Sequence, residues 1–142
     1  IGGVQWQGPA YNPVTRMLYV PAADWCLITK EPVEMTLDRL TALDAATGKV
    51  AWRYESRRPM LSAVTTTSAG VVFAGELTGD FLALDAKTGK VLYRFDTGGR
   101  ITGGTPTYLV KGKQYVATVA GAANAFWHAA PGSSTVVVFA LP

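Results

Sequence analysis

The sequence contains one cysteine, Cys26, and one histidine, His128, among its 142 residues. A single cysteine can form no disulfide within the chain, and no histidine lies near it in the sequence to activate the thiol. We therefore interpret Cys26 as a small, half-buried apolar residue rather than a nucleophile. A lone histidine is more often a loop residue than a ligand, so His128 is not assigned a function.

Charge is also sparse: 16% of the residues are charged, and the net charge is +3. Nucleic-acid binding needs a clustered basic stripe, but Arg57 and Arg58 are the only adjacent basic pair. No run of 18 apolar residues is present, so the sequence predicts no membrane span, and it shows no signal peptide. Because the first residue is Ile1 rather than Met, we expect a fragment, a processed product or a trimmed chain.

Long helical periodicity is the third absence, since no window places apolar residues at i, i+3, i+4 and i+7 over three turns. Apolar residues nevertheless make up 49% of the chain, accompanied by 15 glycines and 8 prolines. This composition is typical of many short strands joined by tight turns. The length predicts a single domain.

An internal repeat dominates what is present. Residues 42–52 read ALDAATGKVAW, and residues 83–93 read ALDAKTGKVLY, so Asp85 lies 41 positions after Asp44. A self-match with a period of 20–50 residues indicates one supersecondary unit used more than once. Eight identities in eleven positions argue against two unrelated hairpins that merely share good turn residues.

Each copy of the repeat is expected to form a β-hairpin. An apolar run precedes the Asp-x-x-Thr-Gly-Lys segment and another follows it, while Asp and Gly supply the turn chemistry. The closing aromatic residue, Trp52 or Tyr93, is expected to pack between neighbouring sheets. We interpret Asp44 and Asp85 as turn formers without a chemical role.

Further strands complete each unit. Short strands are expected at residues 10–12 and 17–21 before the first hairpin, at 63–67 and 71–75 before the second, and at 105–109, 114–120 and 135–141 after it. The Gly-rich link at residues 97–104 is not a phosphate cradle, because no helix follows it. The third unit therefore stops after three strands.

These units predict an all-β fold with about three four-stranded antiparallel blades of a β-propeller. The single domain spans residues 1–142, with blades at about 5–55, 60–96 and 100–142. A partial ring leaves two apolar sheet faces uncovered. We therefore expect the chain to join further blades or further copies of itself, and the strand at 135–141 to pair with a segment that completes the third blade.

Several motifs resemble one family, the pyrroloquinoline quinone (PQQ) dependent methanol and ethanol dehydrogenases. Residues 42–52 fit its tryptophan-docking pattern Ala-x-Asp-x-x-x-Gly-Lys-x-x-Trp, and residues 83–93 fit it with Tyr93 in place of Trp, which weakens that dock. Other similar stretches are Gln5-Trp6 with residues 11–13 and 18–21, residues 72–75, the strand at 112–117 and the chain end at 139–142. The resemblance covers nearly the whole chain and places it in the C-terminal part of an eight-bladed propeller.

The resemblance implies a periplasmic oxidoreductase that converts a primary alcohol to an aldehyde with PQQ and Ca²⁺. The family's catalytic Asp and calcium ligands have no counterpart here, and no acidic cluster offers Ca²⁺ its six to eight oxygen ligands. We therefore predict no catalytic residue and no metal ligand in this chain. Alone, it is expected neither to bind PQQ and Ca²⁺ nor to oxidise alcohols.

Two cofactor-binding residues are carried over by the resemblance, Gln5 and Trp6. Gln5 replaces a family Asn that hydrogen-bonds PQQ, and it is either that contact or an amide that satisfies the backbone. Trp6 is either a cofactor wall or a packing residue. Leu61 stands where some members carry a Trp, so that contact is expected to be lost. Trp127 is either a loop anchor or part of the funnel mouth.

Two other functions remain open from the sequence. The repeat also occurs in a non-catalytic propeller used for protein interaction, the outer-membrane assembly lipoprotein, although that protein gives no reason for Gln5-Trp6. A stand-alone mini-propeller that closes a ring by oligomerising is the second. Nucleic acid is not an expected partner of any of these.

Overall fold

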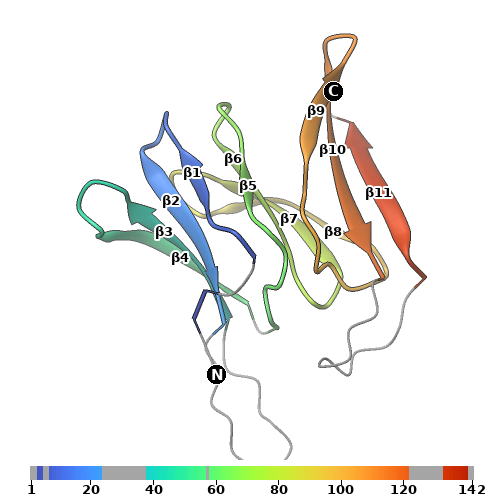
Figure 1. Ribbon diagram of the computed structural model, residues 1–142, viewed down its shortest axis with the longest axis horizontal. Helices are drawn as coiled ribbons and strands as arrows, with labels where there is room; N and C mark the ends of the chain where they lie inside the picture. Colours follow the sequence, from blue (N-terminus) through green and yellow to red (C-terminus); the bar gives the residue numbers. More distant parts are fainter. Residues whose placement is uncertain (1–2, 5–6, 24–37, 57, 122–132, 141–142) are drawn as a thin grey trace, which may run out of the picture.

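The computed structural model describes residues 3–4, 7–23, 38–56, 58–121 and 133–140 (Figure 1). These ranges form eleven β-strands and no helix, so none of their segments is a helix able to cross a membrane. The strands are β1 (Ala10–Asn12), β2 (Met17–Ala22), β3 (Asp38–Asp44), β4 (Val50–Ser56), β5 (Thr65–Thr66), β6 (Val71–Gly75), β7 (Asp80–Asp85), β8 (Val91–Asp96), β9 (Thr107–Val110), β10 (Lys113–Ala120) and β11 (Thr135–Ala140).

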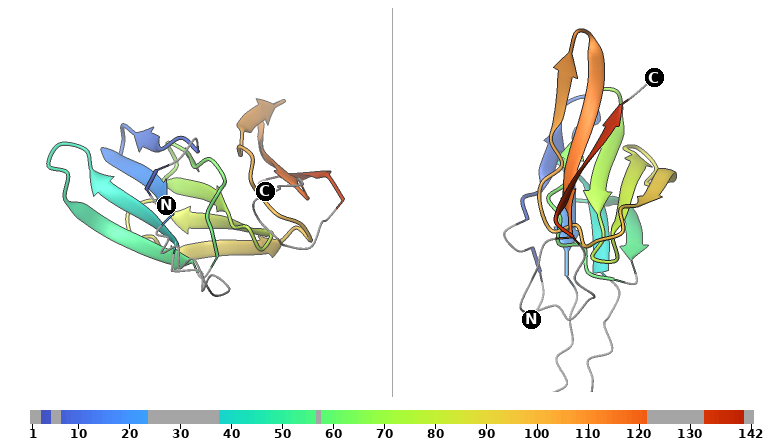
Figure 2. Two further views of the ribbon diagram at one scale, coloured as in Figure 1. Left: turned by 60° about the horizontal axis from the view of Figure 1, so that its bottom comes forward. Right: turned by 90° about the vertical axis from the view of Figure 1, so that its right-hand side faces the viewer.

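The strands form three antiparallel sheets in chain order: the first sheet is β1–β4, the second β5–β8 and the third β9–β11. The sheets are arranged like a fan, with β1 and β5 on one side and β4 and β8 on the other (Figures 1 and 2). The predicted fold class, all-β with about three antiparallel blades of an open ring, is confirmed. As expected, the described third sheet has three strands rather than four.

Both repeat hairpins have the same register. Ala42 lies opposite Trp52 and Ala83 opposite Tyr93, with an irregularity directly after each alanine. In both turns the aspartate Oδ1 accepts hydrogen bonds at 2.8 Å from the amide and the hydroxyl of the threonine three residues later. These bonds lower the pKa of Asp44 and Asp85 below its ordinary value. The interpretation of both residues as turn formers is confirmed.

The inner strand of the second sheet is shorter than predicted, because β5 covers only Thr65–Thr66 instead of residues 63–67. The amide of Ala63 donates to the carbonyl of Gly103 at 3.2 Å, and the hydroxyl of Ser62 accepts from the amide of Gly75 at 2.6 Å. The residues before β5 therefore bond to a neighbouring link and to the end of β6 in place of a regular ladder.

The central strand β7 of the second sheet is buried on both faces. Alternate residues of β7 belong to two separate cores: Leu82 and Leu84 pack toward the first sheet, while Phe81 and Ala83 pack toward the third. All four side chains are buried. A strand covered on both faces is apolar at consecutive positions rather than at alternate ones, which explains the sequence of β7.

The interface between the first and second sheets is built around the carbonyl of Ala86, in the second repeat turn. It accepts hydrogen bonds at 3.0 Å from both the indole nitrogen of Trp52 and the hydroxyl of Tyr19. The indole covers Gly89, where an added Cβ would lie 2.5 Å from Cε3 of Trp52. Trp52 is 8% exposed, so this interface combines apolar burial with two satisfied polar groups.

The interface between the second and third sheets is an aromatic cluster around Phe139 of β11. The Phe139 ring stacks on Phe81 at a centroid distance of 4.4 Å, and Phe81 stacks on Phe73 at 5.7 Å. The rings of Tyr93 and Phe95 stand nearly perpendicular to the Phe139 ring, at centroid distances of 6.1 and 5.4 Å. These contacts join aromatic rings, whereas at the first interface the indole of Trp52 bonds to the carbonyl of a repeat turn.

Candidate functional site

One edge of the fan gathers the segments that lead from sheet to sheet. The link from β4 to β5, the link from β8 to β9 and the β6–β7 turn all lie at the lower edge in Figure 1. The short turns of the two repeat hairpins lie at the opposite edge. We call the lower edge the link edge, and Leu61 belongs to the first of its links.

The predicted cofactor-binding residues Gln5 and Trp6 lie outside the described residues. Their described neighbours are fixed in place: Gly3 and Ala23 form a two-bond bridge at 2.7 and 3.1 Å, which ties the segment to the end of β2. Gln7 is 5% exposed, and its Nε2 has no hydrogen-bond partner among the residues that the structure describes. A buried amide donor without an acceptor costs about 1–3 kcal/mol, so the segment leaves a donor available to an acceptor-rich group.

The first link is held firmly at the link edge. The amide of Met60 donates to the carboxylate of Asp38 at 3.0 Å, and Leu61 is 1% exposed. Leu61 therefore packs as an apolar core residue. The expected loss of a cofactor contact at this position stays a prediction.

The second link joins three elements. The amide of Ile101 donates to the carbonyl of Glu76 at 3.4 Å, and the amide of Gly121 donates to the carbonyl of Arg100 at 2.9 Å. A Cβ on Gly99 would lie 2.8 Å from the Cα of Gly121. Glycine is required here because the link and the end of β10 touch backbone to backbone, which confirms that this Gly-rich stretch is structural.

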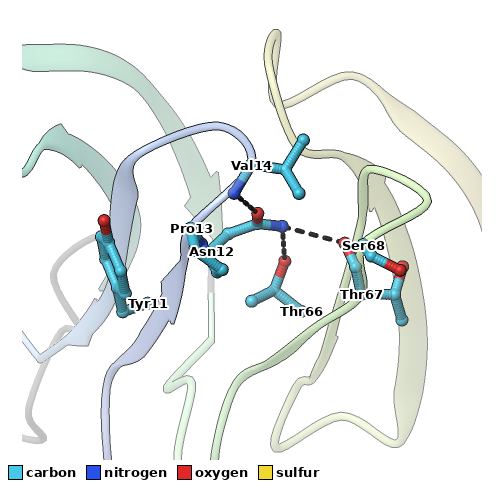
Figure 3. A pocket seen from close by; sticks show the side chains of 7 residues that line it. All are labelled: Tyr11, Asn12, Pro13, Val14, Thr66, Thr67 and Ser68. Carbon is cyan, nitrogen blue, oxygen red and sulfur yellow. Dashed lines mark hydrogen bonds between the residues drawn. The ribbon is translucent and has the colours of Figure 1, made fainter.

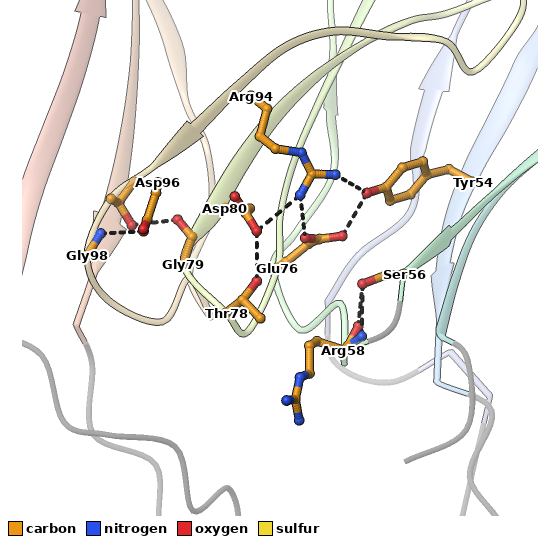
Figure 4. Close-up of polar contacts among 11 residues, drawn as sticks. Tyr54, Ser56, Arg58, Glu76, Thr78, Gly79, Asp80, Arg94, Asp96 and Gly98 are labelled. Carbon is orange, nitrogen blue, oxygen red and sulfur yellow. Dashed lines mark hydrogen bonds and ion pairs between the residues drawn. The ribbon is translucent and has the colours of Figure 1, made fainter. Parts of the chain in front are cut away.

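A polar cluster connects the first and second sheets near the link edge (Figure 4). The hydroxyl of Tyr54 donates to Oε1 of Glu76 at 2.8 Å, and Arg94 contacts Oε2 of Glu76 at 3.2 Å and the Tyr54 hydroxyl at 2.7 Å. Arg94 also pairs with Asp80 at 3.1 Å. No sequence motif indicates this cluster, because its members come from three separate segments.

The cluster changes the acidity of Tyr54. Burial of the phenol, followed by the neighbouring Glu76 carboxylate, raises the pKa of Tyr54 to about 12. A phenol that stays protonated through the physiological range acts as a hydrogen-bond donor rather than a base. The cluster therefore supports the junction between sheets and is not an acid–base pair.

A shallow pocket of about 210 Å³ lies at the other edge, between β1 and β5 (Figure 3). Its polar residue Asn12 is fully engaged: Oδ1 accepts from the amides of Val14 and Thr15, and Nδ2 donates to Thr66 and Thr67. Asn12 thus shapes the turn after β1 and also bonds to the neighbouring sheet. We interpret this pocket as part of the structural contact between the inner strands β1 and β5.

Metal ligands are absent from the described part of the chain, where no group of three His, Cys, Asp or Glu side chains could hold an ion. Cys26, Trp127 and His128 lie outside the described residues. The described residues thus offer the buried amide donor of Gln7, which has no partner among them, and apolar cover at Leu61.

Known proteins match this chain over most of its length. Quinoprotein alcohol dehydrogenase PedH of Pseudomonas putida is 31% identical over 141 residues, which cover 85% of this chain and 24% of that protein. The crystal structure of quinohemoprotein alcohol dehydrogenase from Comamonas testosteroni superposes with a TM-score of 0.84 at 27% identity, over 97% of this chain and 26% of that one. A family model described as outer membrane protein assembly factor BamB matches residues 2–133. The chain belongs to the quinoprotein dehydrogenase family.

As a quinoprotein, the chain spans about a quarter of the length of the curated relatives it matches. A europium-containing methanol dehydrogenase also superposes, with a TM-score of 0.71 at 29% identity, over 84% of this chain and 25% of that one. Two similar proteins carry a lanthanide in their names: this europium-containing enzyme and the lanthanide-dependent methanol dehydrogenase of Methylacidiphilum fumariolicum. Calcium is the metal that the family resemblance implied, whereas these two names carry a lanthanide.

Proposed function

We propose that this chain forms the C-terminal blades of a periplasmic, PQQ-dependent alcohol dehydrogenase that oxidises a primary alcohol to an aldehyde. The observation that carries the proposal is the superposition on a quinohemoprotein alcohol dehydrogenase over 97% of the chain. The residue types in this chain decide which parts of the active site we assign to it and which to other blades. The chain supplies part of the cofactor wall, while blades outside these residues supply the base and the calcium or lanthanide ligands.

Three residues of the N-terminal segment are assigned to the cofactor in this proposal. Gln5 and Trp6 are the residues that the family resemblance implies. Gln7 adds a buried Nε2 donor without an acceptor, and the quinone and carboxylate oxygens of PQQ are acceptors. When bound, PQQ supplies the two-electron acceptor that oxidation of an alcohol requires.

The repeat has a supporting role in the same proposal. Trp52 acts as a tryptophan-docking residue that fixes the second sheet against the first. The uncovered faces of the first and third sheets are covered by the remaining blades of the ring. Stacked sheets of this kind stabilise one another only through their neighbours.

The test compares two proteins: the isolated 142-residue chain and the complete polypeptide encoded by its gene. Each is supplied with PQQ, Ca²⁺ or La³⁺, ethanol and an artificial electron acceptor. The complete protein is expected to reduce the acceptor and the isolated chain is not. Turnover by the isolated chain would contradict the assignment of the base and the metal site to other blades.

A non-catalytic interaction module is the second candidate, because the matching family model is described as an outer membrane assembly factor. It predicts that the complete protein neither binds PQQ nor turns over any alcohol. An oligomerising mini-propeller is favoured by the exposed apolar residues of the third sheet. The mass of the isolated chain in solution separates this candidate, since a stable monomer argues against it.

A further inference from the structure

The edge of the fan opposite the link edge gathers basic side chains. We call it the turn edge and define it by the turns between strands of one sheet, residues 13–16, 44–49, 67–70, 85–90 and 109–113 (Figure 1). All of the lysines in the described part of the chain lie there and are exposed: Lys49, Lys87, Lys90, Lys111 and Lys113. None of them forms a salt bridge with another described residue.

The acidic side chains of the turn edge are few and are already engaged. Its only carboxylates are Asp44 and Asp85, and each accepts hydrogen bonds from the threonine of its own turn. Arg16 is a further exposed cation, so six basic side chains stand against two carboxylates. The exposed charges at the link edge have both signs, as at Glu55 and Arg58. The fold therefore separates a positive edge from a mixed one.

The turns that carry these cations are bonded to one another. In the first sheet, the amide of Ala45 donates to the carbonyl of Arg16 at 3.0 Å. In the second, the amide of Ala86 donates to the carbonyl of Gly70 at 2.9 Å. The carbonyl of Ala86 in turn accepts from Trp52 of the first sheet. A surface that is already fixed loses little conformational freedom on binding, so the cations are displayed at set positions.

An apolar side chain stays exposed among these cations at the third sheet. Leu109 is 72% exposed near the tip of the β9–β10 hairpin, which projects beyond the other turns (Figures 1 and 2). It lies opposite Gln114, two residues before Val116, and therefore on the face that packs against the second sheet. The neighbour on that face is already present, so a further blade beyond the third sheet would not cover Leu109.

A second exposed apolar side chain lies at the boundary between the first and second sheets. Val14 is 67% exposed and lines the pocket of about 210 Å³ together with Pro13 and Thr66 (Figure 3). The sheets on both sides of this pocket are present, so closure of the ring would not cover Val14 either. The turn edge thus keeps both charged and apolar surface exposed.

This mixture of side chains favours one class of partner. A nucleic acid binds mainly through a continuous line of phosphates, for which exposed apolar residues between the cations serve no purpose. A bilayer surface is flat, whereas the β9–β10 hairpin projects beyond the other turns (Figure 1), so a membrane would touch little besides this hairpin. A folded protein can present carboxylates and apolar side chains at different heights, and such interfaces combine the two.

We propose that the turn edge docks a partner protein with an acidic surface, whose carboxylates approach the turn lysines and whose apolar side chains cover Leu109 and Val14. Opposite charges steer such a partner and fix its orientation, and the apolar contacts add affinity. The proposal concerns the edge opposite the link edge and is independent of the proposed activity.

Designed peptides test whether charge and apolar contact act together. The probe is EELEELEELEEL, and its controls are EESEESEESEES, which lacks leucine, and KKLKKLKKLKKL, which has the opposite charge. Fluorescence anisotropy of the labelled peptides measures binding to the complete polypeptide encoded by the gene. We expect the acidic leucine peptide to bind about fivefold or more tightly than the serine peptide, and the lysine peptide not to bind.

Matched double variants separate the turn edge from the net charge of the protein. Lys49→Gln with Lys90→Gln removes one cation from each repeat turn and should weaken binding of the acidic leucine peptide by about fivefold. Arg53→Gln with Arg58→Gln removes the same charge from exposed residues outside the turn edge and should bind as the wild type does. Leu109→Ser should weaken the leucine peptide and leave the serine peptide unchanged. Thermal unfolding verifies that each variant is folded.

Cross-linking locates the contact. A carbodiimide joins a peptide carboxylate to a lysine amine, and mass spectrometry should identify links to lysines of the turn edge. Links only to other lysines, equal loss in both double variants or equal affinity for the leucine and serine peptides would overturn the proposal. So would tighter binding of duplex DNA or of phosphatidylserine vesicles in the same salt, because the partner would then be a nucleic acid or a membrane.

Discussion

The two interfaces of the second sheet share one register and differ in what they bury. Toward the first sheet, Trp52 and Tyr19 donate to the carbonyl of Ala86, so large side chains are packed and their polar atoms are satisfied. Toward the third sheet, Phe139 gathers apolar rings, and Tyr93 stays about half exposed. The same hairpin therefore forms two kinds of interface. We call the interface between the first and second sheets the closed interface and the one between the second and third sheets the open interface.

The difference shows that the aromatic residue of the repeat needs a binding surface on the next sheet. The repeat turn of that sheet is this surface, because it provides a carbonyl acceptor and a glycine against which the indole packs. The third sheet ends at β11 within the described residues and offers no such turn. Three predictions test this comparison.

The largest effect is expected when the aromatic residue of the closed interface is removed. Trp52→Ala should lower the free energy of unfolding by about 3–5 kcal/mol, because a buried ring leaves a cavity. Tyr93→Ala is the matched control and should cost about 1 kcal/mol, because much of its surface is already in water. Urea unfolding of the 142-residue chain measures both, and equal losses would refute the contrast between the interfaces.

The next effect concerns the surface on which the indole rests. Gly89 and Gly48 occupy the same turn position with φ of 72° and 69°, but only Gly89 would bring a Cβ within 4 Å of other atoms, at 2.5 Å from Trp52. Gly48→Ala should cost about 1–2 kcal/mol for the left-handed backbone alone. Gly89→Ala should cost about 1–3 kcal/mol more from overpacking. If the two variants unfold at the same urea concentration, the indole does not rest on Gly89.

The smallest effect belongs to the polar cluster at the closed interface. Tyr54→Phe should destabilise the chain by about 1–2 kcal/mol at neutral pH, because Glu76 loses a donor. The pKa of Tyr54 is raised to about 12 in the folded chain, so its contribution is complete below the ordinary value of about 10. It is lost as the pH rises from 10 to 12.

Stability curves between pH 8 and 12 check the sign of this prediction. The wild type should lose more stability than Tyr54→Phe over the upper part of the range. Tyr93→Phe is a suitable control, since Tyr93 stands in the open interface. A parallel decline in the wild type and Tyr54→Phe would exclude the phenol as the source.

The hairpins of this fold could be predicted from the sequence, because the residues that specify each hairpin lie close together in the chain. The period of 41 residues placed the two hairpins, and the turn chemistry of Asp44 and Asp85 fixed their geometry. Contacts between units were less accessible. Asn12 reads as a turn residue, and nothing in its neighbourhood indicates that its amide also bonds to Thr66 and Thr67, 54 and 55 positions away.

The candidate site likewise combines residues that a motif predicts with residues that only the three-dimensional structure reveals. Gln5 and Trp6 were predicted from a motif, and they remain predictions. The unpaired donor of Gln7 appeared only when burial was known, because no pattern of residue types reveals an unsatisfied amide. The cluster of Tyr54, Glu76 and Arg94 likewise requires a three-dimensional arrangement of separate segments.

The acceptor at the closed interface belongs to the main chain and not to a side chain. Every amino acid carries the same carbonyl, so a duplicated unit inherits the docking point with its fold, and no second substitution has to arise in step with the tryptophan. Two positions are constrained to be small: Ala86, whose side chain is completely buried, and Gly89, on which the indole rests. A joint of this kind lets a ring grow by gene duplication, one sheet at a time, before its copies diverge in chemistry.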